Sequence, residues 1–223
     1  MSFAAEVFAV DDYAPEAAAR VALSLPGAGS VVLTGGATAR PVYEALASSD
    51  AGWGSIEVFF SDERCVPPQD DSSNYLMVRR ALLDPVGAPR VHRMIGEDDP
   101  DAAAAGYHAE VADAARAGFD LLLLGMGADC HVAALFPGSR ALGERERLCV
   151  AVRRPDGLAG LTLTPPPLRG ARRVLLLVAG ETKADAVRRA VSGDEDPARC
   201  PVRLLAGHPD ATFLLDEDSA SLL

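Results

Sequence analysis

Short apolar runs alternate with polar turns and amphipathic stretches along most of the chain. The apolar runs predict β-strands at residues 6–10, 31–33, 56–60, 91–95, 121–124, 148–152, 161–164, 174–178 and 212–215. Helical spacing of apolar positions, or a high alanine content, predicts helices at residues 15–25, 41–47, 72–85, 102–118 and 184–191. Strands and helices that follow one another in this way are typical of the α/β class.

The run at residues 121–124 is the most informative of these strands. It is wholly apolar and ends at Gly125, so it reads as a strand buried on both faces, as found in parallel sheets. The sequence therefore predicts a mostly parallel sheet flanked by helices. Ligands of such sheets bind at the carboxyl ends of the strands, which is where His131 falls.

Three other predicted strands also end in residues suited to binding a ligand. The candidates are Gly35, Gly36 and Thr38 after the second strand, Asp62 and Arg64 after the third, and Lys183 after the strand at 174–178. A glycine turn before a helix presents free N–H groups and the positive end of a helix dipole, which suits a phosphate. Each motif alone also has an ordinary structural explanation. The glycine turn can simply connect a strand to a helix, the charged cluster can form salt bridges in solvent, and Lys183 can reach into solvent. The four strand ends become informative only together.

Composition limits the partners of the chain. Its 223 residues are 49% hydrophobic, and its net charge is −11 with a pI near 4.8. An acidic balance argues against a nucleic-acid or anionic-membrane surface, so an anionic ligand has to be caught locally. No basic amino-terminal region and no run of about 20 apolar residues is present, and we expect a soluble, cytoplasmic protein. Without repeats or long linkers, residues 1–223 are expected to form a single α/β domain.

The four cysteines show no metal-binding or disulfide spacing, so reduced, packing thiols are expected. Cys130 is the one candidate for a thiol nucleophile because it directly precedes His131. A nucleophilic cysteine usually has its base brought from elsewhere in the fold, so this role is disfavoured.

Four segments together resemble the glucosamine-6-phosphate isomerase/6-phosphogluconolactonase family. They are VVLTGGAT (31–38), VFFSDERCVPPQDDSSNY (58–75), DLLLLGMGADCHVAALFPGS (120–139) and RRVLLLVAGETKADAV (172–187). The resemblance implies a Rossmann-like sheet shared with glucosamine-6-phosphate deaminases. It also implies hydrolysis of 6-phospho-D-glucono-1,5-lactone to 6-phosphogluconate in the oxidative pentose phosphate pathway, without a metal or organic cofactor. The expected partner is the sugar-phosphate lactone alone, and a monomer is expected rather than an oligomer.

The resemblance also assigns roles to residues. His131 matches the catalytic histidine, which would activate water as a general base, and Asp129 would orient it. The substrate phosphate would be held by the turn of Gly35, Gly36 and Thr38, with Asp62 beside it and with charge from Arg64 and Lys183.

Several positions depart from the family pattern, and two of them bear most on the site. Cys130 stands where glycine is usual, and Gly160 stands where an arginine is usual. A side chain at position 130 would be strained if the backbone there has a positive φ. Two alternatives therefore stay open: a sugar-phosphate-binding homologue of reduced activity, and a deaminase-type isomerase. The segments DERCVP and LFPGS favour the lactonase.

Overall fold

The computed structural model describes residues 3–88 and 90–223. The strands are β1 (Ala4–Phe8), β2 (Gly29–Leu33), β3 (Ile56–Phe60), β4 (Asp62–Arg64), β5 (Arg90–Val91), β6 (Leu121–Gly125), β7 (Cys149–Arg153), β8 (Ala159–Leu163), β9 (Val174–Val178) and β10 (Ala211–Asp216). The helices are α1 (Tyr13–Ser24), α2 (Ala39–Ala47), α3 (Asn74–Val78), α4 (Asp84–Val86), α5 (Pro100–Glu110), α6 (Ala112–Ala117), α7 (Pro165–Arg169) and α8 (Ala184–Val191). A π-helical turn, Arg79–Leu83, joins α3 to α4.

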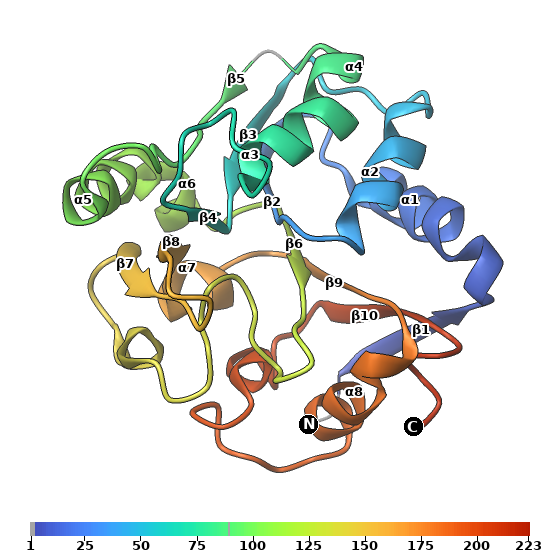
Figure 1. Cartoon of the computed structure of the whole chain (residues 1–223). Helices are drawn as coiled ribbons and strands as arrows, with labels where there is room; N and C mark the ends of the chain where they lie inside the picture. The colour runs from blue at the N-terminus through green and yellow to red at the C-terminus, as the bar shows by residue number, and fades with distance from the viewer. Residues whose placement is uncertain (1–2, 89) are drawn as a thin grey trace.

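Seven strands form the main sheet in the order β1-β10-β9-β6-β2-β3-β5 (Figure 1). Every neighbouring pair in it is parallel. The central strands β6 and β9 are apolar throughout because helices cover both of their faces, and each of their leucine and valine side chains is buried. The predicted parallel α/β fold is confirmed.

The order of the strands explains where a ligand-binding cleft can form. After β2 the chain moves outward through β3 to β5, and after β6 it moves the opposite way through β9 to β10. Right-handed crossovers then place the connecting helices on opposite faces of the sheet. The loops that leave β2 and β6, which are neighbours, diverge and open a crevice between them.

A second, three-stranded antiparallel sheet stands beside the main one, in the order β4-β8-β7. The sequence did not predict β4, because its three residues are all charged. The strand forms because its backbone pairs with β8, with Asp62 opposite Thr162 and Arg64 opposite Gly160. The pairing draws the charged triplet out of the loop in which we expected it and fixes it next to the end of β3.

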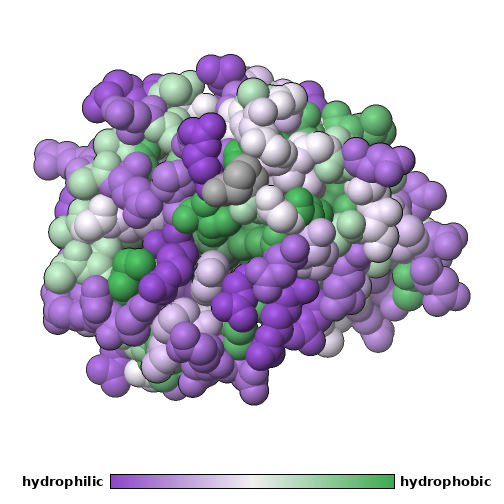
Figure 2. All heavy atoms as spheres, turned by 90° about the horizontal axis from the view of Figure 1, so that it is seen from above, coloured by the Kyte–Doolittle hydropathy of each residue, from purple (hydrophilic) through white to green (hydrophobic). Residues whose placement is uncertain are grey.

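The surface seen around β5 and α4 is largely hydrophilic, with a smaller apolar area near the middle of the view (Figure 2). No helix among the described residues is both long and apolar enough to cross a membrane. All four cysteines are free thiols and three of them are buried, as expected of packing residues.

Candidate active site

The strand ends singled out in the sequence meet at one cleft, which has a volume of about 220 Å³. The loops after β2, β3, β6 and β9 all reach it. Its lining includes Gly35, Gly36, Thr38, Asp62, Arg64, His131 and Lys183, which are all but one of the residues named as candidates. The exception, Asp129, lies behind His131 and contacts it directly.

The turn after β6 is held by backbone hydrogen bonds. Gly127 donates to the carbonyl of His131 over 2.9 Å and accepts from the N–H of Cys130 over 3.0 Å. The N–H of Val202 donates to the carbonyl of Cys130 from the far side. These bonds fix the path of the backbone on both sides of the histidine, so its ring is presented by a rigid turn.

His131 and Asp129 form the chemical centre of this turn. Nδ1 of His131 lies 2.6 Å from Oδ1 of Asp129, and the same carboxylate oxygen accepts the backbone N–H of His131 over 3.1 Å. Partial burial raises the pKa of Asp129, but the hydrogen bonds and charge of His131 outweigh it and leave that pKa below its usual value. An ionised Asp129 can only accept, so Nδ1 carries a proton, and in the neutral imidazole Nε2 is then the nitrogen with the free lone pair.

Gly127 is needed for this pair to form. A Cβ atom added at Gly127 would collide with Nδ1 of His131 and with the carboxylate of Asp129. The ring and the carboxylate therefore occupy the space that a side chain would fill. The ring of His131 also rests against Phe136, with 4.6 Å between the ring centroids.

The turn between β2 and α2 has the geometry expected of an anion-binding loop. It runs from Thr34 to Thr38 along one wall of the cleft, directly before the first residue of α2, Ala39. The first N–H groups of a helix have no partner within the helix and carry the positive end of its dipole. The turn thus presents backbone donors to the same cleft as His131.

Two cations line the same cleft as this turn. Arg64 stands at the end of β4, and its Nε is buried with no hydrogen-bond partner among the described residues. One of its terminal nitrogens donates to the carbonyl of Ser72. Lys183 lies at the start of α8, after β9, and is half-buried. A buried donor without a partner is costly, which fits a place where a ligand anion completes the bonding.

The acidic neighbours of Arg64 build the wall from which it projects. Glu63 accepts the N–H groups of Arg64, Asn74 and Tyr75, and the hydroxyl of Ser73. Burial raises the pKa of Glu63, and these donors act in the opposite direction. The side-chain amide of Asn74 donates to the backbone carbonyl and the carboxylate of Asp62, so Asn74 ties its own loop to β4.

Arg154 is a cleft residue that the sequence did not single out. It follows β7, in the hairpin that leads to β8, and it lines the same cleft as the β2–α2 turn. In the sequence it is one of two neighbouring arginines, Arg153 and Arg154, between two predicted strands, and arginines in such connections ordinarily reach into solvent. Only the pairing of β4 with β8 brings this hairpin to the cleft.

No group of three or more His, Cys, Asp or Glu side chains gathers around a possible metal position in residues 3–88 and 90–223. Cys130 is fully buried behind the turn, and its sulfur lies 3.8 Å from the carbonyl oxygen of Ala186. A thiol in this position does not line the cleft.

The fold and the cleft define the chain as an α/β protein whose parallel sheet carries a histidine, an aspartate and several cations at its switch point. Residues 9–214 match the model of the family described as glucosamine-6-phosphate isomerases/6-phosphogluconolactonase. The chain therefore belongs to this family.

Individual relatives of the chain belong to the same family. A 6-phosphogluconolactonase of Synechocystis is 38% identical over 91% of this chain and 88% of its own length. The solved structure of the 6-phosphogluconolactonase from Trypanosoma brucei has a TM-score of 0.86 at 26% identity, covering 99% of this chain and 98% of the other. A solved monomeric glucosamine-6-phosphate deaminase has a TM-score of 0.87 at 21% identity and shows the shared fold, covering all of both chains.

Proposed function

We propose that the protein hydrolyses 6-phospho-D-glucono-1,5-lactone to 6-phosphogluconate, in the oxidative pentose phosphate pathway. The observation that carries the proposal is the His131–Asp129 pair facing a cleft whose other walls are the β2–α2 turn, Arg64 and Lys183. Relatives named 6-phosphogluconolactonase that align along most of the chain support the same reaction. We also infer that residues 1–223 work as one domain, because buried side chains of both sheets join a single core.

In this mechanism His131 acts as the general base. Asp129 holds the proton on Nδ1, so Nε2 takes a proton from a water molecule as its oxygen attacks the lactone carbonyl carbon. The tetrahedral intermediate collapses by breaking the bond between that carbon and the ring oxygen, which then takes the proton back from Nε2. The product acid loses its proton to water and leaves as a carboxylate.

The substrate phosphate sits against the N–H groups of the β2–α2 turn, between Arg64 and Lys183. These contacts position the lactone and are made equally in the ground and transition states, so they act mainly on substrate binding. The local cations are needed because the protein as a whole carries a charge of −11 and repels a dianion.

The test is lactone hydrolysis by the wild type and by His131→Asn, followed against the spontaneous decay of the lactone. We expect the substitution to lower kcat about 10²–10⁴-fold, the usual range for a general base, with the affinity for 6-phosphogluconate nearly unchanged. His92→Asn is the matched control, because His92 lies outside the cleft and pairs with Glu110.

The same assays separate the alternatives. Ammonia release from glucosamine 6-phosphate with no effect on lactone decay would identify a deaminase-type isomerase. Binding of 6-phosphogluconate in calorimetry without any acceleration of hydrolysis would identify a sugar-phosphate-binding homologue. An unchanged rate in His131→Asn would remove this residue from the mechanism and keep the reaction.

A further inference from the structure

Arg154 occupies a place in the cleft that is made for it by the absence of a side chain at Gly160. A Cβ atom added at Gly160 would lie 3.0 Å from Cδ and 3.3 Å from Cγ of Arg154. The aliphatic part of the arginine therefore lies across the backbone of β8. Gly160 is in turn paired with Arg64 across the β4–β8 ladder, so the two arginines are brought to the same stretch of the cleft wall.

The side chain of Arg154 is held in a fixed orientation. Only 11% of it is exposed, and its Nε donates to Asp156 over 3.1 Å. Its guanidinium carbon lies 5.5 Å from the centroid of Phe136, the ring that also packs against His131. Burial raises the pKa of Asp156, but its bonds to Leu158 and Arg154 and the charge of Arg64 outweigh it and leave that pKa below its usual value.

The terminal nitrogens of Arg154 remain available. Among the described residues the hydrogen bonds of this side chain are made by Nε alone, although the group is mostly buried and lines the cleft. A guanidinium that keeps one edge for a structural bond and leaves its terminal N–H groups unpaired is suited to bind a phosphate oxygen.

We propose that Arg154 is a substrate-binding residue that contacts the phosphate of the lactone together with Arg64. Gly160 leaves room for this placement, because a Cβ atom there would press on Cδ and Cγ of Arg154 at 3.0 and 3.3 Å. The inference rests on the proposed lactone substrate and adds to it a specific contact that the sequence motifs do not contain.

The experiment compares the hydrolysis of 6-phosphoglucono-1,5-lactone with that of glucono-1,5-lactone, which lacks the phosphate. We expect Arg154→Ala to raise the KM for the phosphorylated lactone about 10- to 100-fold with a small change in kcat, the loss typical of a charge-assisted hydrogen bond. Hydrolysis of the unphosphorylated lactone stays as in the wild type. Arg153→Ala is the control, since the neighbouring Arg153 is exposed, does not line the cleft and carries the same charge.

The second arm of the experiment moves the positive charge from the β7–β8 hairpin to strand β8. In the double variant Arg154→Ala/Gly160→Arg, truncation removes Cγ and Cδ of Arg154, the two carbons that a Cβ atom at position 160 would meet. The remaining close atom is the backbone carbonyl oxygen of Glu63, 3.2 Å from that Cβ position. The new arginine starts opposite Arg64, on the same stretch of the cleft wall. We therefore expect the double variant to have a KM for the phosphorylated lactone at least tenfold lower than that of Arg154→Ala. Gly160→Arg alone, with Arg154 still present, gives no such gain over the wild type.

Three results would overturn the proposal. An unchanged KM in Arg154→Ala would remove the contact, and an equal fall in kcat for both lactones would assign Arg154 to the reacting carbonyl instead. An equal rise in KM for both lactones would show that Arg154 does not act through the phosphate. Arg154→Gln keeps the packing on Gly160 and removes the charge, and it replaces Arg154→Ala if circular dichroism shows that the alanine variant is unfolded.

Failure of the reaction itself is a different result. If the wild type accelerates neither lactone, the proposed function is wrong. Calorimetric titration of the same variants with 6-phosphogluconate then still decides whether Arg154 binds the phosphorylated compound, because a weaker affinity in Arg154→Ala than in Arg153→Ala is expected only from the contact.

Discussion

Cys130 adopts a backbone conformation that residues with a side chain seldom have, with φ at 69°. The turn before His131 requires this conformation, since the N–H of Cys130 bonds to Gly127 on one side and its carbonyl to Val202 on the other. The cysteine is retained in spite of the strain because its side chain is fully buried beside the thiol of Cys200. The turn before His131 is thus formed without the usual glycine, which weakens the reason for expecting a binding protein of reduced activity.

We predict that Cys130→Gly is more stable than Cys130→Ala by about 1 kcal/mol. Both variants lose the sulfur, so the comparison isolates the left-handed backbone, which costs a residue with a Cβ roughly 1–2 kcal/mol and glycine almost nothing. Urea unfolding of the two variants measures the difference.

Cys149 supplies the matched control. It is also buried, but it lies in the extended strand β7. There the order should reverse, with alanine more stable than glycine, because glycine loses more backbone freedom in a strand. The same order at both positions would show that the backbone at Cys130 is not strained.

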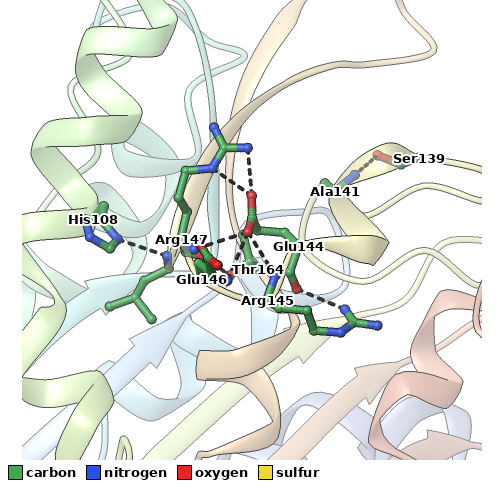
Figure 3. Close-up of polar contacts among 9 residues, drawn as sticks. His108, Ser139, Ala141, Glu144, Arg145, Glu146, Arg147 and Thr164 are labelled. Atoms are coloured by element: carbon green, nitrogen blue, oxygen red, sulfur yellow. Dashed lines mark hydrogen bonds and ion pairs between the residues drawn. The ribbon is translucent and has the colours of Figure 1, made fainter.

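At the scale of the elements, the loop between His131 and β7 is organised around one carboxylate. Glu144 accepts the backbone N–H groups of Arg145 and Glu146 and forms an ion pair with the side chain of Arg147, 2.7 Å away (Figure 3). The hydrogen bond from the N–H of Glu146 and the ion pair with Arg147 lower the pKa of Glu144 to about 2. An ionised side chain therefore ties residues 144–147 of this loop to one another.

This contribution should depend on pH in a defined direction. Because the folded pKa lies below the ordinary value of about 4.3, the carboxylate stabilises the fold fully above about pH 4.3 and loses this effect as the pH falls through about 2. We predict that Glu144→Gln has a lower urea midpoint than the wild type at neutral pH. The gap should narrow below about pH 4.

Glu146→Gln serves as the control, since the side chain of Glu146 is exposed in the same loop. Its urea midpoint should follow that of the wild type at every pH. If the difference in urea midpoint between the wild type and Glu144→Gln stayed constant down to about pH 3, hydrogen bonds to a neutral side chain, and not the charge, would hold the loop.

For the molecule as a whole, the cleft is a point where distant parts of the chain meet. The β2–α2 turn, β4, the turn after β6, the β7–β8 hairpin and the start of α8 each contribute to its lining. An anion bound there would connect all of these segments at once. Since ligand binding stabilises only the folded form, it should raise the stability of the whole protein.

We predict that 6-phosphogluconate at about 100 times its Kd adds about 2.7 kcal/mol, which corresponds to roughly 5–10 °C in Tm for a chain of this size. Gluconate without the phosphate should give a much smaller shift at the same concentration. In Lys183→Ala the shift at that concentration should shrink, because the affinity falls while the rest of the cleft is intact. Equal shifts with both ligands would contradict a phosphate site.

The sequence alone determined the order and type of most elements and the strand ends that matter. The strands at residues 56–60 and 174–178 were predicted with their observed bounds, and the glycine turn, the charged triplet and the GADCH segment were recognised as candidates. These features can be predicted because a short, wholly apolar run indicates a strand buried on both faces, as in a parallel sheet. A parallel sheet places the carboxyl ends of all its strands on one edge.

Only the tertiary structure decided how the walls of the cleft are completed. The pairing of the charged strand β4 with β8, the passage of Arg154 across Gly160 and the burial of Cys130 away from the cleft all depend on segments far apart in the chain. Local sequence carries no signal for them, because charged residues pair by their backbones as well as apolar ones do. A side chain's direction is likewise set by the neighbour that leaves room for it.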